Sequence, residues 1–335
     1  MNQMENQLLV CTANQVNQIL KNKESNIIEI VKNTYLAHEQ GKSSLPQSIF
    51  LRFINDDKNR IIGLPAYLGG DVNKAGMKWI SSFPGNIEHN MERASAAIFL
   101  NEMSTGRVQA VLEGSIISAK RTAASAALAA KYLHGNLEEE AIGLIGCGRI
   151  NQEILHFIKH EFPNIQKVYL YDLSKQRMDQ FILGHKDTTF VFEQCQSIED
   201  LFMNTKLVSF ATTAGIPYID SIQGLTKEHT ILGISLRDLK ENIIENAYNI
   251  VDDFDHVCRE KTSIHLTFQK LESKDFVGGS IAEVIKGTIA PRNPNQATIY
   301  SPFGLGILDL ALSDYVYQEA KKKQLGTIVE NFFSN

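Results

Sequence analysis

The chain has 335 residues, of which 43% are hydrophobic and 21% charged, and its formal net charge is −5. This composition is typical of a soluble globular protein with room for two domains. A slightly acidic chain without a basic tail argues against nucleic-acid binding, and no apolar run is long enough for a membrane span. The four scattered cysteines and an N-terminus unlike a signal peptide favour the cytoplasm, and no metal site is expected.

The first third of the chain predicts two helices followed by a mostly antiparallel β region. Apolar spacing over residues 13–40 is helical. An alanine-rich segment, residues 119–132, predicts a long helix. Between residues 40 and 119, short runs rich in β-branched and aromatic residues are separated by Asp, Asn, Gly and Pro, which predicts strands. The predicted strands are residues 49–53, 61–64, 77–80, 96–100 and 108–112.

From residue 141 onward, apolar runs alternate with helical patterns, which predicts a doubly wound parallel sheet. A last helix, residues 308–323, is expected to pack back on the N-terminal β region. The fold class is therefore α/β, with a Rossmann domain over residues 118–308 and a discontinuous α+β domain made of residues 1–117 and 309–335. The six predicted strands of the parallel sheet are residues 141–146, 167–171, 188–192, 206–211, 230–234 and 248–252.

The segment Ala141–Asp172 carries the pattern of a dinucleotide-binding βαβ unit. Gly146 permits the tight turn after the first strand, and Gly148 lets a pyrophosphate approach the helix N-terminus. Asp172 follows the second strand, where a carboxylate binds ribose hydroxyls and repels a 2′-phosphate, so NAD is favoured over NADP. Asn151 replaces the usual third small residue, which puts close helix–strand packing in question. The expected cofactor residues of this segment are Gly146, Gly148, Arg149, Ile150 and Asp172.

Four basic residues form a candidate site for anionic groups. Lys78 and Arg52 each lie within an apolar strand, and Arg93 precedes a strand. Arg121 is expected in the first turn of the alanine-rich helix, where a cation opposes the helix dipole and a bound anion would remove the conflict. The alternatives are exposure at a sheet edge for Lys78 and Arg52, an ion pair with a nearby glutamate for Arg93, and a solvated surface position for Arg121. Together the four indicate a site that grips carboxylates.

Six segments of the chain carry a family resemblance: GMKW (76–79), NMERAS (90–95), SIISAKRTAASAALAAKYL (115–133), IGLIGCG (142–148), IAEVIKGTIAPR (281–292) and SPFGLGILDL (301–310). They resemble the ornithine cyclodeaminase/μ-crystallin family, and the resemblance extends over nearly the whole chain. It implies a Rossmann domain, a discontinuous substrate-binding and dimerisation domain, a bound NAD(H) or NADP(H), and a homodimer. It also implies that Arg121 holds a substrate α-carboxylate and that Lys78 lies beside the reacting carbon.

Four further positions are expected to touch the cofactor. Thr212 follows the fourth strand of the parallel sheet, at the edge where ligands bind. Thr122 is expected to offer a hydroxyl to a phosphate. Ser235 and Phe303 are placed near the nicotinamide by the resemblance alone.

The family contains several activities, and one departure in this chain separates them. Family cyclodeaminases have a GGDCPGKTEL-type segment whose aspartate acts on the substrate amine. Here the equivalent stretch is GISLRDLKE (233–241), which puts Ser235 at that position unless Asp238 substitutes. Ornithine cyclodeaminase activity is therefore an unfavoured alternative. Alanine dehydrogenase, ketimine reductase and non-catalytic binding of NAD or another small ligand are the others.

Within the family, RIIGLPAYLGG (60–70) together with GMKWISS, NMERAS and SIISAKRTAA resembles the dehydrogenases that form L-2,3-diaminopropionate for siderophores or peptide antibiotics. The implied substrate is N-(2-amino-2-carboxyethyl)-L-glutamate, supplied by a synthase that uses phosphoserine and glutamate. NAD⁺ would oxidise its secondary amine, and water would release 2-oxoglutarate. The substrate has three carboxylates, and Arg52, Lys78, Arg93 and Arg121 supply four cations to bind them.

Overall fold

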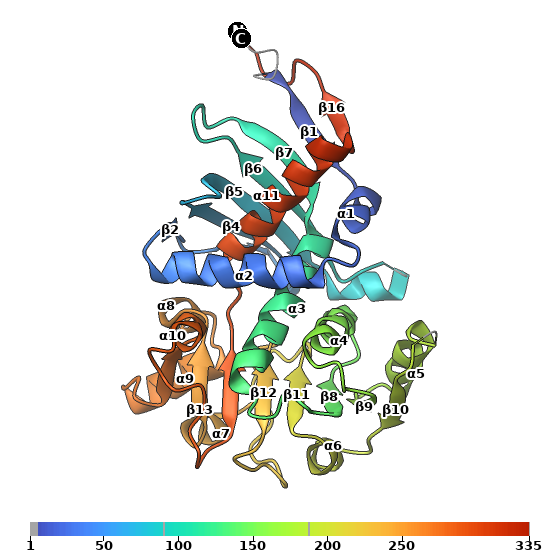
Figure 1. Cartoon of the computed structure of the whole chain (residues 1–335), viewed down its shortest axis with the longest axis vertical. Coiled ribbons are helices and arrows are strands. Elements are labelled where there is room, and N and C mark those ends of the chain that lie inside the picture. Colours follow the sequence, from blue (N-terminus) through green and yellow to red (C-terminus); the bar gives the residue numbers. More distant parts are fainter. Residues whose placement is uncertain (1–5, 90, 187, 335) are drawn as a thin grey trace. The chain divides into compact units, whose positions relative to one another are not determined.

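The computed structural model describes residues 6–89, 91–186 and 188–334 and divides the chain into two compact units (Figure 1). The first unit combines residues up to 121 with residues from 305 onward, and the second spans Thr122–Gly304. Sequence reasoning placed these divisions at 117/118 and 308/309. No helix in the described ranges is long and apolar enough to cross a membrane.

The first unit is an eight-stranded, mainly antiparallel sheet with helices on it. The strand order is β16-β1-β7-β6-β5-β4-β2, with β3 paired to β4, and the β1–β7 pair is parallel. All five strands predicted for this region are present. The strands are β1 (Leu8–Cys11), β2 (Ser43–Ser44), β3 (Ile49–Phe53), β4 (Asp56–Leu68), β5 (Lys74–Ser82), β6 (Ala94–Asn101), β7 (Val108–Glu113) and β16 (Thr327–Val329), and the helices are α1 (Ala13–Leu20), α2 (Glu24–Glu39), the 3₁₀ helix Pro84–His89 and α11 (Gly306–Lys323).

Helix α11 lies across strands β4, β5 and β6 (Figure 1). Its leucines Leu308 and Leu310 are buried, as is Ile98 of β6. Gly76 of β5 permits the close approach, because a Cβ there would lie 2.8 Å from Leu310 Cδ2 and 2.1 Å from a backbone oxygen. The helix can therefore place a polar side chain directly over β5.

The second unit is an eight-stranded sheet of parallel strands in the order β10-β9-β8-β11-β12-β15-β13-β14. This confirms the Rossmann-type fold, but the prediction of six strands was wrong. The two missed strands are β14 and β15, and β15 lies between β12 and β13. The strands are β8 (Ala141–Ile145), β9 (Lys167–Tyr171), β10 (Val191–Gln194), β11 (Leu207–Phe210), β12 (Thr230–Gly233), β13 (Tyr248–Val251), β14 (Val277–Ser280) and β15 (Thr298–Ser301).

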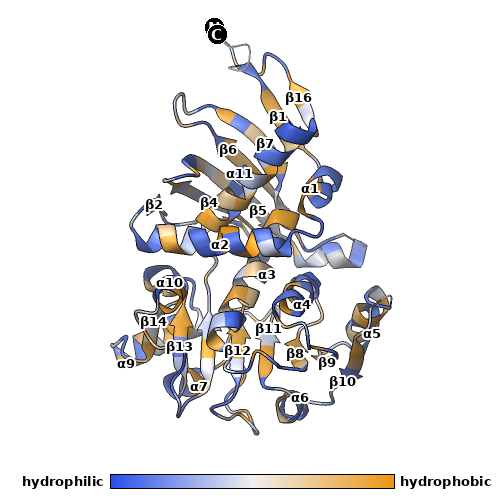
Figure 2. Ribbon diagram, viewed as in Figure 1, coloured by the Kyte–Doolittle hydropathy of each residue, from blue (hydrophilic) through white to orange (hydrophobic). Residues whose placement is uncertain are grey.

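Helices flank this sheet and bury its core. Phe157, Leu201 and Ile299 are fully buried, and the central strands carry hydrophobic segments in Figure 2. The carboxyl ends of all eight strands meet at one edge, where ligands bind in open parallel sheets. The helices are α4 (Arg149–Glu161), α5 (Lys175–Gly184), α6 (Ile198–Asn204), α7 (Glu241–Glu245), α8 (Phe254–Val257), α9 (Ser263–Leu271) and α10 (Ile281–Lys286).

The alanine-rich helix begins earlier than its composition indicates. Helix α3 runs over Gly114–Leu133, so Arg121 and Thr122 lie in its interior rather than in its first turn. The carboxylate of Glu113 accepts the backbone N–H groups of Ser115 and Ile116 at 2.8 and 3.1 Å, which caps the helix start. The expected conflict between Arg121 and the helix dipole was therefore wrong, and another feature must account for this arginine.

Candidate active site

Two of the four expected cations meet on one buried carboxylate, which the sequence reasoning missed. Lys78 Nζ on β5 donates to Asp309 Oδ2 at 2.7 Å, and Arg121 Nε on α3 donates to Asp309 Oδ1 at 3.0 Å. Lys78 also donates to Ser118 Oγ at 3.1 Å. Asp309 is contributed by α11 and is only 1% exposed. We call Lys78, Arg121 and Asp309 the cation–carboxylate triad.

The triad carries two positive charges and one negative charge in a nearly dry environment. Burial lowers the pKa of Lys78 to about 8, with Asp309 opposing the shift and Arg121 reinforcing it. Burial alone would raise the pKa of Asp309, but the charges of Arg121 and Lys78 hold it below its usual value. An incoming carboxylate would balance the remaining positive charge, and a lysine with this pKa is able to exchange protons near neutral pH.

The other two expected cations lie along the same face of the sheet. Arg52, Arg60 and Ser82 face one another across β3, β4 and β5. Arg93 Nη1 donates to Ser82 Oγ at 2.7 Å. Ser82 lies four residues from Lys78 on β5, which is about 13 Å at roughly 3.3 Å per residue. The first unit therefore brings Lys78 and Arg121 together. It places Arg52 and Arg93 around Ser82, about 13 Å further along the sheet.

The second unit holds the glycine turn that the sequence predicts for a pyrophosphate. Gly146 has a φ of +91°, and a Cβ there would lie 2.6 Å from the carbonyl oxygen of Ala211. Gly148 is the N-cap of α4, and a Cβ built on it meets nothing within 4 Å. Arg149 and Ile150 are the first two residues of α4. Backbone N–H groups at that position have no partner within a helix, so the turn offers them to an anion.

Asp172 and Asn151 fix the shape of this turn. Asp172 Oδ2 accepts the backbone N–H of Cys147 at 2.8 Å, and its Oδ1 accepts that of Ser174 at 2.9 Å. Asn151 is fully buried and donates from Nδ2 to the carbonyl oxygens of Ile145 and Gly146 at 3.0 and 2.7 Å. The amide thus bonds the turn directly, and the departure from a small residue at this position is compatible with close packing.

Thr212 and Ser235 share one carboxylate at the carboxyl edge of the sheet. Each follows its strand, β11 or β12, by two residues. Thr212 Oγ1 donates to Asp238 Oδ1 at 2.5 Å, and Ser235 Oγ donates to Asp238 Oδ2. Burial raises the pKa of Asp238, while hydrogen bonds from Ser235, Thr212 and Tyr218 oppose the rise. Asp238 is thus already bonded by hydroxyl groups.

The remaining expected cofactor residues are held by their surroundings. Phe303 packs against the core of the second unit, and its backbone N–H donates to Asp252 Oδ1 at 2.8 Å. The buried Asp252 also accepts the N–H of Gly304 at 2.7 Å, so one carboxylate at the end of β13 fixes this segment. Thr122 lies half-buried within α3.

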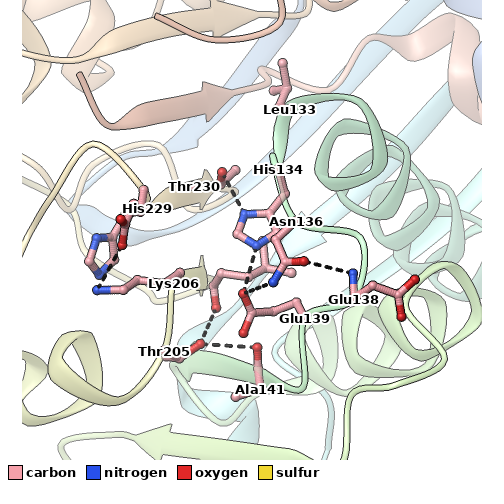
Figure 3. Close-up of polar contacts among 12 residues, drawn as sticks. Leu133, His134, Asn136, Glu138, Glu139, Ala141, Thr205, Lys206, His229 and Thr230 are labelled. Carbon is pink, nitrogen blue, oxygen red and sulfur yellow. Dashed lines mark hydrogen bonds and ion pairs between the residues drawn. The ribbon is translucent and has the colours of Figure 1, made fainter. Parts of the chain in front are cut away.

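A pocket of about 380 Å³ lies at the opposite, amino edge of the parallel sheet. Figure 3 shows the polar network beside it, in which His134 contacts Thr230 Oγ1 at 3.0 Å and Glu139 Oε2 at 3.1 Å. Arg292 donates to Thr230 Oγ1 at 2.7 Å and to the carbonyl of Leu133 at 2.8 Å. These groups bond one another and tie the starts of the strands together, so we assign the network a structural role.

Sequence reasoning missed two residues, although each has a recognisable feature in the sequence. Asp309 is a lone acid in an apolar helical run, Gly306–Leu312, and a charge at such a position must have a buried partner. Asp252 directly follows the apolar run of β13 at the ligand-binding edge.

Comparison with known proteins finds relatives that match nearly the whole chain. The model of the ornithine cyclodeaminase/mu-crystallin family matches residues 6–324. The chain is 29% identical to N-((2S)-2-amino-2-carboxyethyl)-L-glutamate dehydrogenase of Staphylococcus aureus, covering 97% of this chain and 98% of the relative. It is 27% identical to an alanine dehydrogenase of Archaeoglobus fulgidus, covering 97% and 98%. A solved archaeal alanine dehydrogenase dimer with bound NAD matches 98% of this chain and 100% of its own, with a TM-score of 0.85 and 26% identity.

Proposed function

Since this chain belongs to the ornithine cyclodeaminase/mu-crystallin family, we propose that it is an NAD-dependent dehydrogenase acting on the CH–NH bond of an amino-acid conjugate. The substrate we propose is N-(2-amino-2-carboxyethyl)-L-glutamate. The resemblance to the Staphylococcus aureus dehydrogenase supports this choice, because it extends over both chains almost completely. The observation that carries the proposal is the triad, whose uncompensated positive charge is buried and suits a carboxylate.

The proposed reaction is balanced as follows. The substrate, NAD⁺ and water yield L-2,3-diaminopropionate, 2-oxoglutarate, NADH and one proton. The glutamate α-carbon and the bridging nitrogen each lose a hydrogen to form a carbon–nitrogen double bond, and water then adds to the carbon. The C–N bond breaks, and the nitrogen leaves with the diaminopropionate.

The residues of the triad have separate tasks in this proposal. Arg121 holds a substrate carboxylate through its planar fork. Lys78, with its pKa of about 8, removes the proton of the bridging amine and returns one to the departing amine. Arg52 and Arg93, further along the sheet, bind the other carboxylates. Asp309 orients both inner cations and is not itself a substrate ligand.

The second unit has the features that an NAD site needs. The open space at Gly148 and the start of α4 fit a pyrophosphate, and Asp172 is held in place at the end of β9 to bind ribose hydroxyls. Thr122, Thr212, Ser235 and Phe303 complete the proposed set. Bound NAD⁺ would supply a hydride acceptor.

Other activities of the family remain as alternatives for the test. The alanine dehydrogenase relative favours a smaller amino acid, and a ketimine reductase would run the reaction toward the amine. Cyclodeamination is disfavoured, because Asp238 is 3% exposed and already accepts hydrogen bonds from the hydroxyl groups of Thr212, Ser235 and Tyr218. It is therefore poorly placed to replace the aspartate missing at position 235. A non-catalytic binder would have little use for a lysine with a lowered pKa.

The deciding experiment supplies purified protein with NAD⁺ and the conjugate and identifies the products by mass spectrometry. Formation of diaminopropionate and 2-oxoglutarate in equal amounts with NADH supports the proposal. Turnover of L-alanine or of a cyclic ketimine with NADH, without turnover of the conjugate, assigns one of the alternatives. In the cell, the conjugate would come from a synthase that joins phosphoserine and glutamate, and the product would enter a siderophore or antibiotic pathway.

We also propose a homodimer formed through the face of the first sheet that points away from Lys78. Ile49, Leu51 and Trp79 share that face by strand register and are 59%, 43% and 36% exposed. The solved alanine dehydrogenase at 26% identity is a dimer. Light scattering after gel filtration should give a dimer for the wild type and a monomer for Trp79→Glu. Leu173→Glu, at a 94% exposed apolar site in the other unit, should leave the dimer intact.

A further inference from the structure

The buried carboxylate of Asp238 is surrounded by hydroxyl groups instead of cations. Thr212, Ser235 and Tyr218 all bond to it, and no described lysine or arginine forms an ion pair with it. Its backbone carbonyl accepts the N–H groups of Tyr218 and Ile219 at 3.1 and 2.9 Å, so the residue is held on both sides. A buried carboxylate of this kind costs stability unless all its partners are in place, which makes its presence worth explaining.

The position of these hydroxyl groups points to a ligand. Strands β11 and β12 are parallel neighbours, with Phe210 opposite Gly233, so Thr212 and Ser235 both lie at the carboxyl edge. The glycine turn is adjacent, because a Cβ on Gly146 would lie 3.3 Å from Thr212 Cα. The hydroxyl pair is therefore next to the turn proposed to hold the pyrophosphate.

The hydrogen-bond direction follows from the chemistry of the groups. A hydroxyl has one hydrogen and two lone pairs, whereas an ionised carboxylate only accepts. Thr212 Oγ1 accepts the backbone N–H of Ala214 at 3.1 Å and donates to Asp238, so its hydrogen is committed. Ser235 likewise commits its hydrogen to Asp238. Toward a ligand, both oxygens therefore present lone pairs only.

We propose that Asp238 is a positioning residue that sets cofactor specificity: by binding the hydroxyl hydrogens of Thr212 and Ser235, it makes both oxygens acceptors for the carboxamide N–H₂ of the nicotinamide. This inference rests on the proposed NAD-dependent function. It adds a specific requirement, that the ring substituent must donate a hydrogen bond at this edge of the sheet.

The test compares two dinucleotides that differ only at that substituent. NAD⁺ carries a carboxamide, and 3-acetylpyridine adenine dinucleotide carries an acetyl group with no N–H. Calorimetry should give the wild type a preference of about tenfold for NAD⁺, because the analogue leaves two acceptors unpaired. Asp238→Asn replaces one of the two acceptor oxygens by an N–H₂ group, which donates to Ser235 or to Thr212 and frees the hydrogen of that hydroxyl to point outward. The preference should then fall to about one or reverse.

Two further variants separate this role from a general loss of structure. Ser235→Ala removes one acceptor and should lower the preference several-fold without placing an amide at position 238. Asp220→Asn changes an exposed carboxylate that pairs only loosely with Lys240, at 3.5 Å, and should keep the wild-type ratio. Circular dichroism checks the fold of each variant.

Each outcome decides the matter. The role of Asp238 would be overturned if folded Asp238→Asn or Ser235→Ala kept the wild-type ratio of affinities for NAD⁺ and the acetylpyridine analogue. It would also be overturned if the wild type bound both dinucleotides with equal affinity. In those cases NAD⁺ still binds, and the proposed function stands. If neither dinucleotide binds the wild type, the proposed function itself fails, and this inference fails with it.

Discussion

The substitution Asp309→Asn tests whether the triad is held together as the structure indicates. Asp309 is 1% exposed and contacts Lys78 at 2.7 Å and Arg121 at 3.0 Å. Removing the charge leaves two buried cations without an anion. Breaking a buried ion pair on one side typically costs about 3–5 kcal/mol, so we expect the free energy of unfolding to fall by about that amount at pH 6.

The loss should depend on pH in a direction that the pKa of Lys78 determines. In the wild type, the folded pKa of about 8 lies below the ordinary 10.5, so stability rises with pH from about 8 to 10.5 as the folded state releases the proton first. Without Asp309, whose charge favours the protonated lysine, the folded pKa falls below 8. The variant therefore starts to gain stability at lower pH than the wild type. The difference in free energy of unfolding between the wild type and Asp309→Asn should therefore shrink between pH 6 and 8, by up to about 1.4 kcal/mol per pH unit.

Urea unfolding at several pH values measures these differences. Trp79, the only tryptophan, follows Lys78 on β5 and reports on the first unit by its fluorescence. Asp314→Asn is the matched control, because Asp314 lies on the same helix α11, is only partly buried, and accepts a hydrogen bond from the side chain of Gln318 at 3.1 Å. It should change stability by less than about 1 kcal/mol. The role of Asp309 in neutralising Lys78 and Arg121 would be refuted if Asp309→Asn lost less than about 1 kcal/mol of unfolding free energy at pH 6. A loss that stays constant up to pH 8 would refute it as well.

Three further substitutions test the other assignments. Arg121→Lys keeps the charge but loses the planar fork, so turnover should fall at least tenfold while NAD⁺ affinity by calorimetry is unchanged; normal kinetics would rule out a substrate contact. Lys78→Ala should lower the steady-state rate of product formation by about 10²–10⁴, the usual range for an acid–base group, and a normal rate would exclude that role. Asp172→Asn should reduce the preference for NAD⁺ over NADP⁺ at least about tenfold, because the repelling charge is lost; an unchanged ratio of dissociation constants would contradict the ribose assignment.

The parts of the fold with strong local signals were predictable. The turn between β8 and α4 contains Gly146, whose φ is +91°. The glycine pattern after the apolar run predicted the position of this turn. The antiparallel strands were recognisable because β-branched and aromatic runs are interrupted by turn residues. The start of α3 was missed, because Ile116 and Ile117 favour strand locally, whereas in the fold they are buried within a helix capped by Glu113.

The parts that depend on distant contacts were not predictable. β15 has only four residues, Thr298–Ser301, and its place between β12 and β13 follows from packing and not from chain order. The role of Arg121 likewise depends on Asp309, which is 188 positions away in the chain. A pattern along one strand or helix carries no information about such a partner.

The late strands determine when the protein can finish folding during its synthesis. β15 fills the gap between β12 and β13, and β16 pairs with β1, so the two sheets remain incomplete until residues 298–301 and 327–329 have been made. The ribosome must deliver α11 as well before the first sheet has its cover. Until then, a nascent chain of this design exposes the unpaired edges of β1, β12 and β13, and edge-to-edge association between chains competes with folding.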